Sequence, residues 1–208
     1  VMNAPAGLLL SKIIRPETET PMSRDALHVQ VERTDANVVE AASSGAATGV
    51  QLALNVGGML MAFIALIAMI NFGIGWVGGL VGLEGLSLQT LFGTVLRPLA
   101  WVMGVPWAET GYVGGLMGLK VTLTEFVAYA QFGADMTSGA VTLSPRAAIV
   151  SAYALLGFAN VACIGIQIGG IGGLAPSRRS DLARFGLRAM VAGNLAAFMS
   201  ATLAGMIL

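Results

Sequence analysis

A glycine-rich stretch in the second half of the chain constrains the fold more than any other part. It runs from Gly157 to Gly173 and lies inside a longer run, Ala147 to Ser177, that contains no charged residue. The longer run could cross a bilayer as a helix, but the stretch contains six glycines, which are weak helix formers. Asn160 and Gln167 would also place amides at membrane depth, where an unpaired amide is costly.

Two interpretations of this stretch are open from its residues. Irregular backbone is tolerated at membrane depth only where protein or a water-filled cavity supplies hydrogen-bond partners. A hydrophobic helix that is interrupted by glycine and contains Asn160 near its middle is typical of a transporter's binding helix. We therefore predict a broken transmembrane helix over residues 145–176, with a site at its break. The alternative is a helix whose glycine face packs against a neighbour and whose amides bond across to it.

Composition indicates an all-α, multi-pass integral membrane protein. Hydrophobic residues make up 56% of the chain and charged residues 11%, whereas a soluble domain has about 25% charged residues. The 11 basic and 11 acidic residues cancel, so no basic surface indicates a nucleic-acid partner. Cys163 is the single cysteine, which excludes an intrachain disulfide and a cysteine-based metal cluster. His28, the single histidine, lies in a polar segment, where we expect a solvated loop residue rather than a ligand. We expect no cofactor.

The N-terminal part reads as the end of one membrane helix and a polar connection. Residues 1–15 are mostly apolar but too short to span, and we interpret them as the second half of a broken helix from a preceding part of the protein. Arg15-Pro16 ends this helix, because the residue before a proline resists the α conformation. Residues 16–49 are expected to form a polar connection and then an interfacial helix that begins near Asp35.

Residues 50–104 are expected to contain a scaffold helix and an oblique helix. Val50 to Phe72 is the clearest spanning helix, and six glycines between Gly73 and Gly85 are expected to end it. Leu86 to Gly104 is mostly apolar, but Arg97-Pro98 should split it, so we expect a short oblique or interfacial helix there.

Residues 105–137 are predicted to form a re-entrant helical hairpin, which enters the membrane and returns to the same side. Two segments, Pro106 to Leu119 and Glu125 to Phe132, are each too short to cross, and Lys120 to Thr124 separates them. A polar turn, Gly133 to Ser144, should follow before the broken helix starts at Pro145.

The last transmembrane helix is expected over residues 180–208, with Ser180-Asp181 as its N-terminal cap. A cluster of basic residues lies just before this helix and in its first turns. It favours a cytoplasmic loop under the positive-inside rule, and a binding site for an anionic substrate is the alternative. The cluster consists of Arg178, Arg179, Arg184 and Arg188.

Four residues are candidates for a substrate site. Glu125 is an ionisable group near the hairpin tip, and such a group at membrane depth is a functional candidate unless it pairs with Lys120. Asn160 can both donate and accept a hydrogen bond at the helix break. Phe158 could stack on a planar ligand or only pack, and Cys163, one turn from Asn160, could share its face or be a small apolar filler. Because no base accompanies a nucleophile and no carboxylate pair occurs in one apolar segment, we expect no enzyme.

Several short sequences in a fixed order resemble the concentrative nucleoside transporter family, as the C-terminal half of a bacterial member. The resemblance covers almost the whole chain, and a set of such sequences is far more specific than any one of them. They are Val1-Met-Asn-Ala-Pro-Ala6, Pro16-Glu-Thr-Glu19, Asn37-Val-Val-Glu-Ala41, Gly104-Val-Pro-Trp107, Thr124-Glu-Phe-Val-Ala-Tyr129, Gly157-Phe-Ala-Asn160, Ile164-Gly-Ile166 and Ala175-Pro-Ser-Arg178.

The resemblance implies a homotrimer of the inner membrane that moves nucleosides such as uridine by symport with sodium or protons. Members contain two inverted repeats, each with a hairpin and a broken helix that meet at the substrate. Glu125 and Asn160 match the ribose-binding residues, and Phe158 matches an aromatic residue of the same pocket. Cys163 stands where relatives have a serine, and Thr124 where they often have asparagine, which puts fine specificity in doubt. Most sodium ligands, and the hairpin that recognises the base, would lie before Val1.

The residues also leave other functions open. A passive channel or a structural membrane subunit could use the same helices for packing alone. An inverted-repeat carrier for another small solute is a further alternative.

Overall fold

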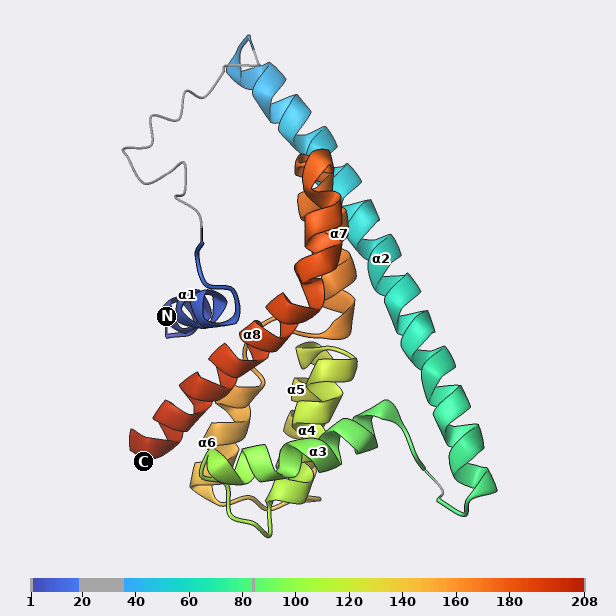
Figure 1. Ribbon diagram of the computed structural model, residues 1–208, viewed down its shortest axis with the longest axis vertical. Coiled ribbons are helices and arrows are strands. Elements are labelled where there is room, and N and C mark those ends of the chain that lie inside the picture. Colours follow the sequence, from blue (N-terminus) through green and yellow to red (C-terminus); the bar gives the residue numbers. More distant parts are fainter. Residues whose placement is uncertain (1, 19–35, 84, 208) are drawn as a thin grey trace.

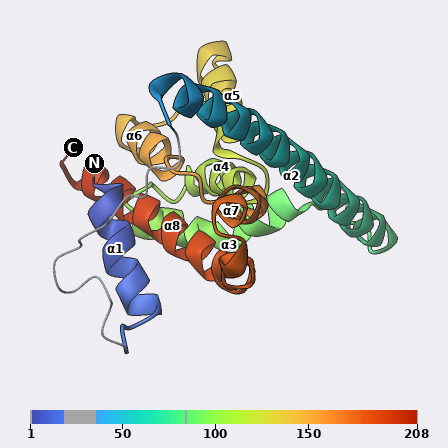
Figure 2. The same ribbon diagram turned by 90° about the horizontal axis from the view of Figure 1, so that it is seen from above.

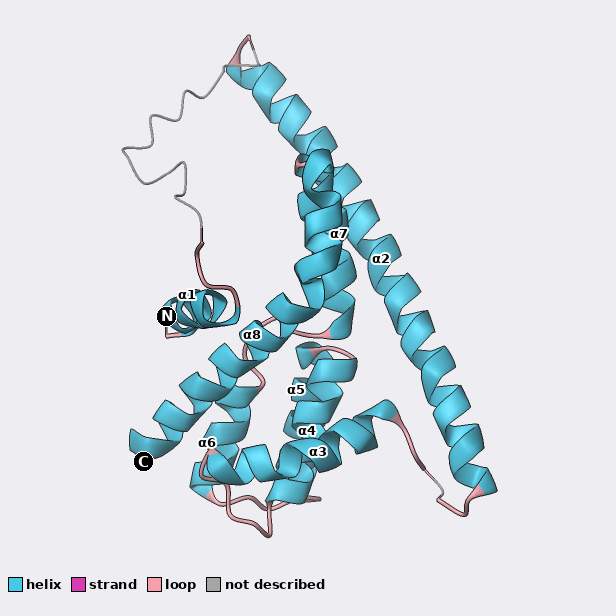
Figure 3. Ribbon diagram, in the orientation of Figure 1, coloured by secondary structure: helices cyan, strands magenta, loops and turns pink. Residues whose placement is uncertain are grey.

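The computed structural model describes residues 2–18, 36–83 and 85–207, and all regular structure in these residues is helical (Figures 1 and 3). Most of the polar connection predicted within residues 16–49, including His28, lies outside the described residues. The elements in chain order are α1 (Asn3–Ile14), α2 (Val38–Leu80), α3 (Leu88–Val102), α4 (Thr110–Thr122), α5 (Glu125–Ser138), α6 (Pro145–Ala154), α7 (Val161–Leu174), the 3-10 helix η1 (Pro176–Arg178) and α8 (Arg179–Ile207).

Helix α2 is a single 43-residue helix. Asn37 caps its start by accepting a hydrogen bond from the Glu40 N–H at 2.9 Å. The separate interfacial helix predicted before residue 50 was wrong, because α2 is continuous from Val38. The helix ends at Leu80, within the glycine-rich run Gly73 to Gly85 that was predicted to end it, although the first glycines of that run are still helical. Glycine lowers helix stability by only about 1 kcal/mol relative to alanine, and in an apolar surrounding a helix still satisfies every backbone polar group internally.

Helix α3 is likewise continuous, so the split predicted at Arg97-Pro98 was wrong. Ser87 and Thr90 form a capping box at its start, and Pro98 lies within the helix. The helix crosses α4 at close range (Figure 1). A Cβ atom at Gly118 would lie 2.6 Å from the backbone oxygen of Gln89, so this crossing requires glycine.

Helices α4 and α5 form an antiparallel hairpin. Only Leu123 and Thr124 separate them, and Thr124 caps α5 by accepting from the Val127 N–H. The outer ends are joined by the Tyr112 hydroxyl, which donates to Asp135 at 2.8 Å. Because α5 continues to Ser138, the polar turn is shorter than predicted.

Helices α6 and α7 are separated by an irregular segment, residues 155–160. Ser144 caps α6 with Pro145 in its first turn, as the sequence indicates. Gly157 in the irregular segment has φ +93°, a backbone conformation that residues with a side chain rarely adopt. Asn160 has extended backbone and is the N-cap of α7. The charge-free run therefore contains two short helices rather than one crossing helix.

Helix α8 starts at Arg179, so Ser180-Asp181 lies in its first turn and is not the cap that was predicted. Among the described residues, Pro176–Ile207 is the one helical segment long and apolar enough to cross a membrane. Helix α8 packs against α6, α7 and α1. An apolar core lies between α3, α4, α6 and α8, and its buried members include Met103, Val113, Met117, Val150 and Phe198.

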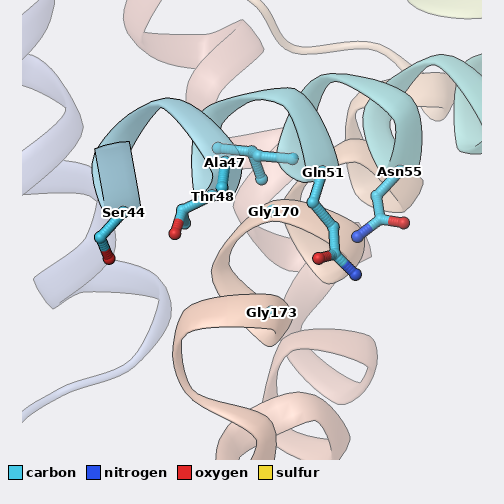
Figure 4. Close-up of a pocket in the computed structure, with 8 residues that line it drawn as sticks. Ser44, Ala47, Thr48, Gln51, Asn55, Gly170 and Gly173 are labelled. Atoms are coloured by element: carbon cyan, nitrogen blue, oxygen red, sulfur yellow. The ribbon is translucent and has the colours of Figure 1, made fainter. Parts of the chain in front are cut away.

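Helix α2 lies at the side of the molecule, and in the view from above its far end projects beyond the other helices (Figures 1 and 2). Its main contact is with α7. A cavity of about 380 Å³ lies at this contact, with Thr48, Gln51 and Asn55 of α2 facing Gly170 and Gly173 of α7 (Figure 4). The rest of α2 presents exposed apolar side chains, among them Leu54, Met61, Phe72 and Trp76.

Candidate functional site

The tip of the α4–α5 hairpin meets the break between α6 and α7 through two buried side chains. The Asn160 Nδ2 donates to the Glu125 Oε2 at 2.9 Å. Asn160 is fully buried and Glu125 is 9% exposed. The Asn160 Oδ1 accepts from the Cys163 N–H at 2.8 Å. Because this acceptor must face the N–H, the amide nitrogen is held toward the carboxylate, and the orientation of Asn160 is fixed.

The Glu125 carboxylate lies at two helix N-termini. Glu125 is the first residue of α5, and its partner Asn160 is the N-cap of α7. Each N-terminus contributes roughly half a positive charge, which stabilises a carboxylate there. Among the described residues, no group donates a hydrogen bond to the other oxygen, Oε1. This oxygen can accept a hydrogen bond from a polar ligand.

The two remaining candidates lie on either side of Asn160. Cys163 is buried in the first turn of α7, where its backbone is bonded to Asn160. Phe158 lies in the irregular segment, and its side chain is 76% exposed. The structure thus brings Glu125, Asn160 and Cys163 together, and it places Phe158 beside them with an open ring face.

Lys120 does not pair with Glu125, so the ion pair considered as the alternative role for Glu125 was wrong. The two ion pairs among the described residues are Lys12–Glu17 and Arg178–Asp181. The Lys120 ammonium instead donates to the backbone oxygens of Ala154 at 2.9 Å and Leu156 at 3.1 Å. Among the described residues, Glu125 therefore makes no direct ion pair with a side-chain cation.

Asn194 of α8, which was not among the residues predicted from the sequence, also contacts the break between α6 and α7. Its Nδ2 donates to the backbone oxygen of Ala159 at 2.6 Å, within the irregular segment. Asn194 is the single amide side chain in the charge-free run Ala189 to Leu208, and that isolation was the available signal. Backbone oxygens at the break thus accept hydrogen bonds from Lys120 of α4 and from Asn194 of α8, as an apolar surrounding requires.

The arrangement offers fixed hydrogen-bond donors and acceptors rather than a metal centre. Within the part of the chain that the structure describes, no group of three or more His, Cys, Asp or Glu residues could hold a metal ion. A buried carboxylate oxygen, a weakly polar thiol and an exposed aromatic ring suit a solute with hydroxyl groups and a planar part. A polar site between a helical hairpin and a broken helix is typical of membrane transport proteins.

The comparison with protein families places the chain within that class. Residues 1–205 match the family described as "Na+ dependent nucleoside transporter C-terminus". The chain belongs to this family, which confirms the resemblance found in its sequence and implies a membrane protein.

Curated relatives are named as transporters, and two of those described here are named for nucleosides. The chain is 48% identical, over 99% of its length, to the uncharacterized transporter YutK of Bacillus subtilis, of which it covers 50%. It is 42% identical to the nucleoside permease NupC of Helicobacter pylori and covers 49% of that protein. Sodium/nucleoside cotransporter 1 of Mus musculus is 41% identical, with 34% of it covered. The chain spans about half the length of its bacterial relatives.

Solved structures of CNTnw resemble this fold to different degrees. A variant in the intermediate 3 state has a TM-score of 0.87 at 47% identity, covering 99% of this chain and 49% of CNTnw. CNTnw in an inward-facing substrate-bound state has a TM-score of 0.73 at 48% identity, covering 98% and 47%. Because the identities are nearly equal, the two TM-scores differ through the arrangement of the helices and not through sequence similarity.

Proposed function

We propose that the protein containing this chain is a cation-coupled symporter that moves nucleosides across the inner membrane of a bacterium. The contact of Glu125 with Asn160, where the hairpin tip meets the helix break, is the observation that supports this proposal. The family description and the sodium/nucleoside cotransporter relatives favour sodium over protons as the coupling ion. Most ligands of this ion are expected in the part of the full-length protein that this chain does not span.

In this proposal, the ribose of a nucleoside such as uridine binds at the hairpin tip. The Glu125 Oε1 accepts a hydrogen bond from a ribose hydroxyl. The other carboxylate oxygen, Oε2, accepts from Asn160, and this bond holds the carboxylate in place. Phe158 lies against a face of the nucleoside, and Cys163 lines the ribose side of the pocket. A thiol donates only weakly, so the Cys163 contact contributes less than a hydroxyl would.

We further propose an alternating-access mechanism in which the hairpin and the broken helix move together. Buried polar contacts join these two elements, whereas α2 meets the rest mainly along α7, so α2 is the natural scaffold. The hairpin would be re-entrant, and the chain would form one of two inverted repeats.

Counterflow tests transport against a passive channel, the main alternative. In proteoliposomes with the full-length protein, internal unlabelled uridine should accelerate entry of labelled uridine, because a carrier exchanges substrate faster than it returns empty. An inward sodium gradient should also drive accumulation. Entry that is unaffected by preloading would contradict the carrier proposal. Competition by carboxylates but not by uridine would instead indicate an anion carrier that uses the Arg178 cluster.

The exposed apolar face of α2 leads us to propose a homotrimer, as the family resemblance implies. Side chains such as Met61, Phe72 and Trp76 lie on a helix that is little covered within this chain. Crosslinking of the purified full-length protein in detergent should saturate at trimers. Saturation at dimers would contradict the proposal.

A further inference from the structure

Lys120 is a fully buried cation that the proposed function has not used. Its side chain has no exposed surface, and its ammonium lies 5.3 Å from the centre of the Phe198 ring. Both of its hydrogen bonds go to backbone oxygens at the C-terminal end of α6, those of Ala154 and Leu156. A buried ammonium is costly unless strong acceptors surround it, so this placement needs an explanation.

The C-terminus of α6 is a cation site by its backbone chemistry. The last four carbonyl groups of a helix have no partners within it and together present roughly half a negative charge. At α6, turn N–H groups satisfy Ser151 and Tyr153, and the Tyr129 hydroxyl donates to Ala152. The remaining carbonyl of the helix, Ala154, accepts from Lys120.

In transporters with broken helices, such carbonyl groups at the end of a half-helix commonly coordinate the coupling cation. We infer that the Lys120 ammonium is a tethered cation that permanently occupies this position at the α6 break. The break in this half of the protein would then bind no mobile coupling ion. This inference rests on the proposed transport function.

The tethered cation also positions the substrate site. The hairpin places Lys120 at the negative C-terminus of α6 and Glu125 at the positive N-terminus of α7, so each charge faces a helix end of opposite sign. Because Lys120 and Glu125 are five residues apart on the same tip, the two contacts set its position together. Lys120 is therefore a positioning residue that acts through Glu125.

The test replaces the tethered cation by a free one in the full-length protein. Lys120→Ala should lower initial uridine uptake about ten-fold or more, because it removes the two hydrogen bonds from a charged donor, of which one alone is worth about ten-fold. Ethylammonium, which has N–H donors and fits the space left by the lysine, should restore uptake and raise the thermal unfolding midpoint. Tetramethylammonium has the same charge but no N–H group and should restore neither.

Two further variants separate charge from packing. Lys120→Met fills the same space without an ammonium and should remain impaired, whereas Lys12→Ala, at an exposed lysine of α1, should behave as wild type. Wild-type uptake by Lys120→Met would overturn the inference. So would a Lys120→Ala protein whose unfolding midpoint is equal in ethylammonium and in tetramethylammonium. The midpoint needs no transport, so this readout can fail independently of the proposed function.

Discussion

Replacing Asn160 by aspartate is expected to lower nucleoside uptake about a hundred-fold, the equivalent of roughly 3 kcal/mol, while α7 stays capped. An aspartate oxygen can still accept from the Cys163 N–H, because Asp and Asn cap helices equally well. Its other oxygen, however, would face the Glu125 Oε2, which Asn160 now contacts at 2.9 Å. The variant loses a hydrogen bond to a charged acceptor, worth about 1.5–3 kcal/mol, and adds repulsion between two carboxylates.

Two controls separate the cap of α7 from the contact with Glu125. Asn160→Ser keeps a capping oxygen but cannot reach Glu125, so it should lose uptake about ten-fold, the value of one lost charged hydrogen bond. Lowering the pH should recover part of the activity of Asn160→Asp, because one proton shared by the two carboxylates removes their repulsion. Uptake by Asn160→Asp equal to that of wild type would mean that this contact is not part of the site.

The elements that the sequence predicts well are those with local signals. Ser144-Pro145 at the start of α6 and Asn160 at the start of α7 are side chains whose capping partners lie three residues away. The same holds for Asn37 and Thr124. Gly157 and Asn160 therefore indicate an interrupted helix without reference to any tertiary contact.

The features that the sequence could not predict depend on distant contacts. Nothing near Lys120 indicates that its ammonium bonds to carbonyl groups more than 30 residues later, and a pairing with Glu125 was the nearer possibility. The link from Asn194 to Ala159 spans a similar distance along the chain. The first glycines of the run from Gly73 and the proline in α3 do not interrupt their helices, because the remaining backbone hydrogen bonds outweigh a local loss of stability.

Glu125→Gln should weaken uridine uptake by roughly ten-fold to a hundred-fold. A glutamine can keep the bond from the Asn160 Nδ2 through its carbonyl oxygen, so the hairpin tip should stay in place. Its amide nitrogen would then replace the Oε1, and the charged acceptor for a ribose hydroxyl would be lost. A hydrogen bond to a charged group contributes about 1.5–3 kcal/mol, and each ~1.4 kcal/mol is a factor of ten.

A double cycle in proteoliposomes tests directly whether the Glu125 carboxylate binds the ribose. Initial uptake would be measured against concentration for wild type and Glu125→Gln, each with uridine, 2′-deoxyuridine and 3′-deoxyuridine. Removing the contacted hydroxyl and removing the carboxylate should each lower uptake, and the two losses should not add, because either change alone already removes the contact. Strictly additive losses with both deoxynucleosides would mean that Glu125 does not touch the ribose.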